Sequence, residues 1–168
     1  SISANGQYVA FRSQASNLVL SDPNGTREDI FVYDLGAGTM ELVTFNGNAS
    51  SREPTISSDG SYVAFRSNAN NLVPEDPNGT ASDVFVYDRN NGTMSILTSG
   101  GKAASRKPSI SADGQFIAFR SRASNLAASD SNGTVDDIFV YDSITQTTTL
   151  ESVNDATIDD DVFACGQP

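Results

Sequence analysis

The sequence predicts an all-β protein in which a four-stranded antiparallel sheet is repeated three times. Two observations lead to this prediction. A phrase of turn formers and acids that runs into an apolar strand occurs three times at a spacing of 54 residues: SDPNGTREDIFVYD (21–34), EDPNGTASDVFVYD (75–88) and SDSNGTVDDIFVYD (129–142). In addition, no segment sustains the 3.6-residue apolar period of a helix.

The repeat divides the chain into three units, 1–54, 55–108 and 109–168, each of which ends in proline. Units one and two are identical at 32 of 54 positions, which indicates duplication of a structural unit. The third unit is longer and carries an extended acidic linker at its C-terminal end, with three aspartates at 159–161. We interpret this linker as a connection towards a further blade; a solvated acidic loop is the alternative.

Each unit is expected to contain four short strands. In unit two the first is brief and follows Pro54, and Asp59-Gly60 then makes a hairpin turn because glycine tolerates positive φ. The next two strands are dense in β-branched and aromatic residues, which favour strands. The four expected strands of this unit are 56–57, 62–67, 83–88 and 93–98.

The second and third strands of each unit are apolar on both faces, as in VAF (9–11) and IFVY (30–33). A sheet with one face in water would alternate apolar and polar residues. Sheets stacked between neighbours are covered on both sides, so the pattern favours the blades of a β-propeller.

SISADGQFIAFRS (109–121) followed by DIFVYD (137–142) resembles the TolB-like β-propeller repeat, a relative of the WD-type blades. The resemblance covers all three units and rests on an S-x-D-G turn before an apolar strand that ends in AF, followed by an acidic turn and a second apolar strand. It implies a bacterial periplasmic or extracellular propeller that serves as a binding platform or as an appendage to an enzyme. It also implies six blades.

Three blades are too few for a closed ring, because closed propellers have four to eight. The outer faces of units one and three would remain uncovered and would favour association. We therefore expect a head-to-tail homodimer that closes a six-bladed ring, with unit three of each chain packed on unit one of the other. The alternative is that the chain is half of a longer propeller.

The repeated acidic loop is the candidate metal site. It has the form D-x-N-G-T-x-x-D, and carboxylate and amide oxygens are hard donors of the kind that Ca²⁺ binds. One structural Ca²⁺ per unit is therefore expected. The candidate ligands are Asp22, Asn24, Thr26 and Asp29 in unit one, Asp76, Asn78, Thr80 and Asp83 in unit two, and Asp130, Asn132, Thr134 and Asp137 in unit three.

A metal-free turn is the alternative explanation of this loop. Asp-Pro-Asn-Gly fits a type I turn, and Asp29 could bond backbone amides at the start of its strand. The loop also departs from an EF-hand, because its glycine comes two positions early and the closing glutamate is missing. A turn alone does not explain the second aspartate, which every unit carries.

Composition argues against several classes of function. The net charge of −11 disfavours nucleic acid and anionic membranes as partners, and no apolar run approaches the ~18 residues of a membrane helix. The absence of histidine excludes Ser-His-Asp and Cys-His machinery, and no P-loop or dinucleotide fingerprint occurs. A catalytic carboxylate pair is normally asymmetric, whereas these acids recur identically. The chain is not expected to be an enzyme.

The expected function is that of a binding or scaffold module whose loop face contacts an unknown protein or glycan. A calcium-dependent, lectin-like module is one alternative, but the loops are poor in aromatic residues, with Phe45 as the exception. An accessory propeller half from a larger peptidase-like or surface protein is another. Cys165 is the only cysteine, so no intrachain disulfide is possible.

Overall fold

Eleven strands in three antiparallel sheets make up the computed structural model, which describes residues 1–128, 130 and 135–152. Within these residues there is no helix, as the sequence predicts. The strands are β1 (Tyr8–Ser13), β2 (Asp29–Asp34), β3 (Thr39–Leu42), β4 (Ser51–Ile56), β5 (Tyr62–Ser67), β6 (Asp83–Asp88), β7 (Thr93–Ile96), β8 (Ser105–Ile110), β9 (Phe116–Ser121), β10 (Asp137–Asp142) and β11 (Thr147–Leu150). The end of the predicted acidic linker, 153–168, lies outside the described residues.

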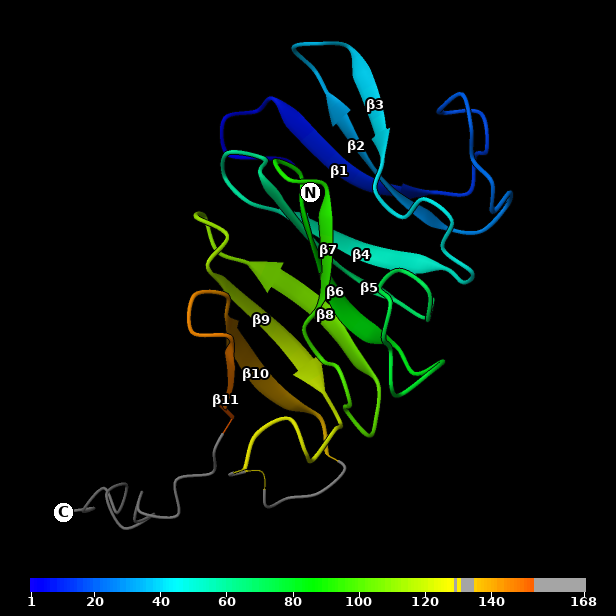
Figure 1. Ribbon diagram of the computed structural model, residues 1–168. Helices are drawn as coiled ribbons and strands as arrows, with labels where there is room; N and C mark the ends of the chain where they lie inside the picture. The colour runs from blue at the N-terminus through cyan, green and yellow to red at the C-terminus, as the bar shows by residue number, and fades with distance from the viewer. Residues whose placement is uncertain (129, 131–134, 153–168) are drawn as a thin grey trace, which may run out of the picture.

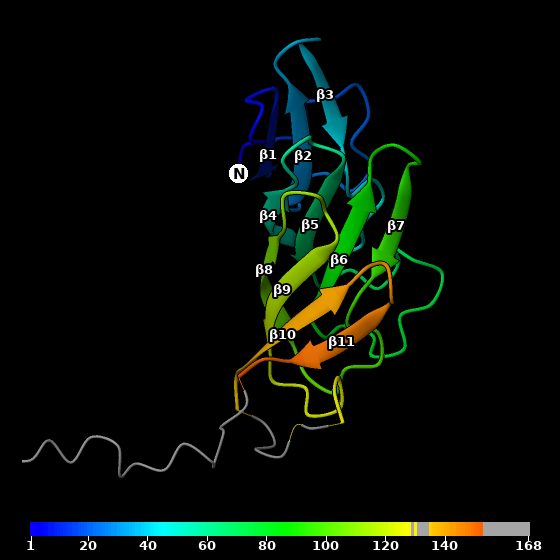
Figure 2. The same ribbon diagram turned by 90° about the vertical axis from the view of Figure 1, so that its left-hand side faces the viewer.

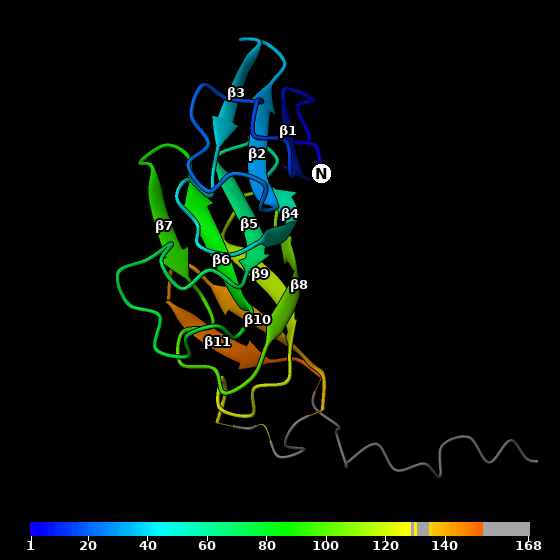
Figure 3. The same cartoon turned by 90° about the vertical axis from the view of Figure 1, so that its right-hand side faces the viewer.

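Each sheet is a meander in which neighbouring strands follow one another in the chain. The orders are β1-β2-β3, β4-β5-β6-β7 and β8-β9-β10-β11. The three sheets are stacked one on the next (Figure 1). Strands β4 and β8 lie along one side of the stack, and β7 and β11 lie along the other (Figures 2 and 3). This is the arrangement of successive propeller blades.

The first sheet has three strands among the described residues, whereas four were predicted. Its innermost strand is represented only by Ile2, which bridges to Val9. Ile2 is equivalent to Ile56, the last residue of β4, which pairs with Val63 in the same way. The first sheet therefore consists of three strands and this single bridge.

The innermost strand of the second blade is longer than predicted and begins at Ser51, before the proline. The sequence predicts a strand only after Pro54, whose nitrogen has no hydrogen to donate to a ladder. A β-bulge accommodates the proline within the strand. The register of β4 on β5 shifts between Arg52 and Thr55, and Glu53 takes a positive φ of 57°. Strand β8 shifts in the same way between Arg106 and Ser109.

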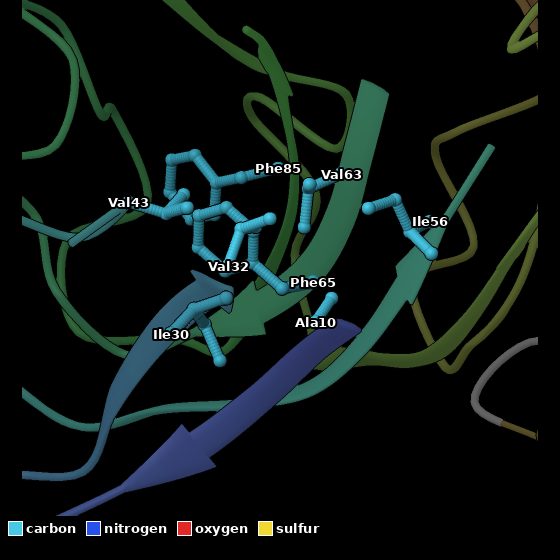
Figure 4. Close-up of a cluster of buried hydrophobic side chains, with 8 residues drawn as sticks. All are labelled: Ala10, Ile30, Val32, Val43, Ile56, Val63, Phe65 and Phe85. Atoms are coloured by element: carbon cyan, nitrogen blue, oxygen red, sulfur yellow. The ribbon is translucent and has the colours of Figure 1, made fainter. Parts of the chain in front are cut away.

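The core lies between the blades and forms two clusters. The first joins blade one to blade two, and its buried members are Ala10, Ile30, Val32, Val43, Ile56, Val63, Phe65 and Phe85 (Figure 4). The second joins blade two to blade three and is formed by Ala64, Val84, Leu97, Ile117, Phe119 and Phe139. Successive residues of β5 therefore serve opposite clusters, because side chains alternate across a strand. This confirms that the middle blade is covered on both faces.

The end blades keep apolar side chains on their outer faces. Ile138 is 44% exposed, whereas Ile30, its equivalent in blade one, is fully buried. At the other end Phe11 is only partly buried, whereas the equivalent Phe65 is fully buried. The same residue is buried where another blade packs against its face and more accessible where none does.

Candidate calcium site in the acidic loops

The candidate loops join β1 to β2 in blade one and β5 to β6 in blade two. Each loop delivers its second aspartate to the first position of the following strand, where Asp29 and Asp83 are fully buried. The first aspartate and the asparagine of each loop are partly buried. The two loops therefore place the same polar groups at the same rim of successive blades.

One oxygen of the buried aspartate is bound by two donors. In blade one the Thr44 hydroxyl donates to Oδ1 of Asp29 at 2.6 Å, and the Asn24 amide donates to the same oxygen at 2.8 Å. Blade two repeats this arrangement, with Thr98 at 2.6 Å and Asn78 at 3.0 Å from Asp83.

The asparagine amide nitrogen is fully used in both loops. Besides the aspartate, it donates to a backbone carbonyl of the following linker, Gly47 in blade one at 3.1 Å and Gly101 in blade two at 3.0 Å. These contacts fix the orientation of the side chain, and they leave its carbonyl oxygen as a free acceptor.

The remaining side-chain oxygens of each loop share one property: they are buried acceptors without a hydrogen-bond donor. They are Asp22 Oδ1, Asn24 Oδ1 and Asp29 Oδ2 in blade one, and both carboxylate oxygens of Asp76, Asn78 Oδ1 and Asp83 Oδ2 in blade two. A buried polar atom without a partner is costly, and native structures contain few of them. All of these atoms are carboxylate or amide oxygens, which accept hydrogen bonds but cannot donate them. Oxygens of this kind are the ligands that hard cations prefer.

Burial shapes the electrostatics of the two inner aspartates. It raises the pKa of Asp29 and of Asp83, although hydrogen bonds from the threonine and the asparagine oppose the shift. The carboxylates of Asp22 and Asp76 raise these pKa values further. Each loop thus holds two mutually repelling carboxylates in a partly dehydrated place.

The predicted ligands are only partly brought together. Thr26 and Thr80 are exposed at the outside of their loops. In blade three, Asp137 is buried and its Oδ1 accepts a 2.6 Å bond from Ser152, and Asp130 is partly buried. The remaining candidates of that loop, Asn132 and Thr134, lie outside the described residues.

Sequence reasoning missed the hydroxyl that anchors each inner aspartate. Thr44, Thr98 and Ser152 lie 15 residues after their aspartates, in the stretch that follows the outer strand. The available signal was their spacing of 54 residues in the repeat. Among the described residues, no group of three or more acidic, histidine or cysteine side chains could hold a metal. The loops of blades one and two each bring together two carboxylates and one amide.

The described residues contain no helix long and apolar enough to cross a membrane. No protein-family model matches the sequence, and no curated protein matches it.

Solved structures with the same fold are found among β-propellers. The chain aligns over 89% of its length with TolB from Acinetobacter baumannii, at 20% identity and a TM-score of 0.58. It aligns over 86% with the β-propeller domain of the Trilobed protease from Pyrococcus furiosus (14%, TM-score 0.58) and over 92% with dipeptidyl peptidase 4 of Porphyromonas gingivalis (16%, TM-score 0.55). It spans 30%, 38% and 25% of those chains. The protein therefore has the blade architecture of a TolB-like β-propeller.

Proposed function

We propose that this chain is a non-catalytic β-propeller module for binding a partner, and that a structural Ca²⁺ in each blade holds the loops of one rim. The observation that carries the calcium proposal is the set of buried side-chain oxygens without donors, which occurs at equivalent positions of two blades. Repetition of the same polar cluster at one rim supports a structural role rather than catalysis.

The chemistry of the loops fits calcium. The loop of blade one offers three free oxygens and that of blade two offers four, in each case from two carboxylates and an amide. Backbone carbonyls and water would complete the six to eight ligands that Ca²⁺ takes. The ion would compensate the repulsion between Asp76 and Asp83 and between their counterparts in blade one. It would also fasten a long connection to the rim of its blade.

The metal-free turn is less well supported. In an Asx-type turn the Asp76 side chain would accept a hydrogen bond from the backbone two residues on. Both of its carboxylate oxygens are instead buried without a donor. The turn is closed through the backbone, where Gly79 N–H donates to the Asp76 carbonyl at 3.3 Å, as in the type I turn that the sequence predicts. The turn therefore forms without its carboxylate, which is left for another task.

The partly exposed end faces support ring closure by a second copy. Ile138 and Phe11 lie on the outer faces of the last and first blades, where their equivalents in the middle of the stack are buried. We propose a head-to-tail homodimer that forms a six-bladed ring.

A protein or glycan ligand would bind at the loop rim. Two carboxylates per loop predict weak calcium binding, since affinity rises with the charge of the ligands. Weak binding agrees with a periplasmic or extracellular location, because extracellular calcium modules have Kd values of about 10⁻⁴–10⁻³ M.

Calorimetry of chelator-treated protein tests the calcium sites. Ca²⁺ is expected to give a saturable heat and to raise Tm, since a ligand that binds only the folded state stabilises it. The Asp83→Asn variant should lose one site. Glu75→Gln, which removes an exposed acid of the same loop, is the matched control and should retain every site. An absence of heat together with an unchanged Tm would exclude the metal.

A further inference from the structure

The two interfaces between blades share one contact near the hairpin turns. The Tyr8 ring of blade one rests on Gly60 of blade two, and the Tyr62 ring of blade two rests on Gly114 of blade three. A Cβ at either glycine would collide with the tyrosine ring, and both glycines have positive φ. Both interfaces therefore contain the same contact of a tyrosine ring with a glycine.

The first interface is completed by a guanidinium group. Arg89 lies 4.4 Å from the centroid of the Tyr8 ring, within the range of a cation–π contact. It donates to the Gly60 carbonyl at 2.7 Å and to the Glu41 carboxylate at 2.8 Å. An aromatic face, a carbonyl oxygen and a carboxylate thus surround the planar guanidinium group, whose fork of donors distinguishes arginine from lysine.

The second interface has a serine at the equivalent position. Ser143 N–H donates to the Gln115 carbonyl at 2.9 Å, just as Arg89 N–H donates to the Ser61 carbonyl at 2.9 Å. Ser95 likewise takes the place of Glu41, since each pairs with the equivalent valine of its central strand. The long cationic side chain and its carboxylate are thus both replaced by short hydroxyls.

A cavity of about 270 Å³ lies where these replacements occur. Its walls include Tyr62, Gly114, Asp88, Tyr141 and Ser143. This volume is just below the ~300 Å³ at which small-molecule sites begin, so it suits a small group rather than a large ligand. The tyrosine and the glycine of the first interface are retained here, and a space remains above them.

Asp88 provides the negative charge for this cavity. It lies opposite Tyr62 in the sheet, as Asp34 lies opposite Tyr8. The pKa of Asp34 is lowered first by the hydrogen bond from the Ala37 backbone, and the charge of Arg89 contributes further. A cation at the first interface therefore acts on the equivalent of Asp88.

We propose that the cavity between the second and third blades is a binding site for a guanidinium group. The group would stack on Tyr62, donate to the Gly114 carbonyl and face Asp88, in the arrangement that Arg89 adopts one blade earlier. The occupant is either a free small guanidine or an arginine side chain of a partner protein, and both present the same chemistry. Ser95 stands where Glu41 forms an ion pair with Arg89 in the first interface. Without this second carboxylate, the bound guanidinium group would dissociate readily.

Titration with methylguanidinium chloride tests the site, with methylammonium chloride at equal ionic strength as the reference cation. The readout is the amide chemical shifts of Gly114 and Ser143, at concentrations well below those that unfold proteins. Saturable shifts are expected with methylguanidinium and not with methylammonium. Equal responses to the two cations would overturn the proposal.

Two variants make the test specific. Ser143→Arg should fill the cavity with its own guanidinium, abolish the saturable shifts and raise Tm. Leu35→Arg makes the same substitution at the equivalent position of blade one, whose amide donates to the Gln7 carbonyl, and it should leave the shifts at Gly114 unchanged. Saturable shifts that persist in Ser143→Arg would show that the cation binds elsewhere and would overturn the assignment.

The first interface offers a converse test that does not depend on the second. Arg89→Ser should lower Tm, because it removes the cation–π contact and leaves Glu41 without its ion-pair partner. Methylguanidinium should then restore part of the lost stability, which methylammonium should not. Failure of rescue would contradict the view that this architecture recognises a guanidinium group.

The source of the natural group is distinguished by comparing agmatine with a short Gly-Arg-Gly peptide. Binding of the peptide at least tenfold more tightly than agmatine would indicate an arginine of a partner protein. Equal or tighter binding of agmatine would indicate a free guanidine. If neither displaces methylguanidinium, the proposal that a natural guanidinium group occupies this cavity is overturned.

Discussion

Thr98 donates a 2.6 Å hydrogen bond to Asp83 and accepts one of 3.1 Å from the amide of Val84. Its single hydroxyl thus links the stretch after β7 to the start of β6, at a place where both partners are buried. Thr44 makes the same two bonds in blade one, to Asp29 and from Ile30. The hydroxyl that binds the inner aspartate of the candidate calcium site therefore also connects the segment after the outer strand to the preceding strand.

Replacing Thr98 by valine is expected to lower the free energy of unfolding by about 1–3 kcal/mol, because it leaves a buried N–H without an acceptor and removes a donor from the carboxylate. Urea denaturation measures the change. Thr93→Val, at an exposed position at the start of the preceding strand β7, should cost much less. Equal losses in the two variants would show that the hydroxyl has no special role.

The calcium-free protein should show a distinctive pH dependence at the inner aspartates. Burial raises the folded pKa of Asp83 above its ordinary value of 3.8. The stability that this group contributes is therefore fully present below pH 3.8 and is lost as the pH rises through the folded pKa. In chelator, Asp83→Asn should become progressively more stable relative to the unmodified chain across this window.

Asp59 is the control for the pH experiment, because its pKa is shifted in the opposite direction to that of Asp83. Hydrogen bonds from Ser61, and then from Ser57, lower its pKa to about 2. Its contribution is present above pH 3.8 and is lost as the pH falls through about 2. Asp59→Asn should therefore lose stability relative to the unmodified chain at neutral pH, whereas Asp83→Asn in chelator should gain it. Parallel pH profiles for the two variants would contradict the opposite pKa shifts of these two carboxyl groups.

Equivalent phenylalanines should differ in their contribution to stability. Phe65 is fully buried between blades one and two, and Phe65→Ala should cost about 3–5 kcal/mol, as expected for a large core side chain. Phe11 stacks on its neighbouring strand at the same centroid distance of 5.8 Å but is only partly buried. Phe11→Ala should cost clearly less in dilute protein, measured by chemical denaturation. A similar cost would mean that blade one is already covered.

Ring closure by two copies predicts a particle of about twice 17.7 kDa in size-exclusion chromatography with light scattering. Ile138→Glu, on the open face of blade three, should shift the protein to a monomer because it places a charge in the interface. Ile144→Glu, in the exposed turn between β10 and β11, should leave the dimer intact. A monodisperse monomer of the unmodified chain would remove the dimer proposal.

Local sequence patterns predict the structure of a single blade. The 54-residue period, the strands at 62–67 and 83–88 and the apolar character of both their faces follow from local patterns, and the structure has these two strands at the predicted bounds. The acids of the repeated loop were also visible, because residues that perform one task in each blade recur at one spacing. Local chemistry and repetition carry this information without knowledge of the three-dimensional arrangement.

Contacts between positions far apart in the chain depend on how the strands pair and the blades stack. Pro54 was expected to precede its strand, but a bulge admits it, and this depends on the register with β5. Thr44 meets Asp29 only when the outer edge of the blade turns back, and Arg89 reaches Tyr8 only when two blades stack. Pairing register and blade stacking have no local signature, because each depends on which distant groups remain to be buried or bonded once the sheets have formed.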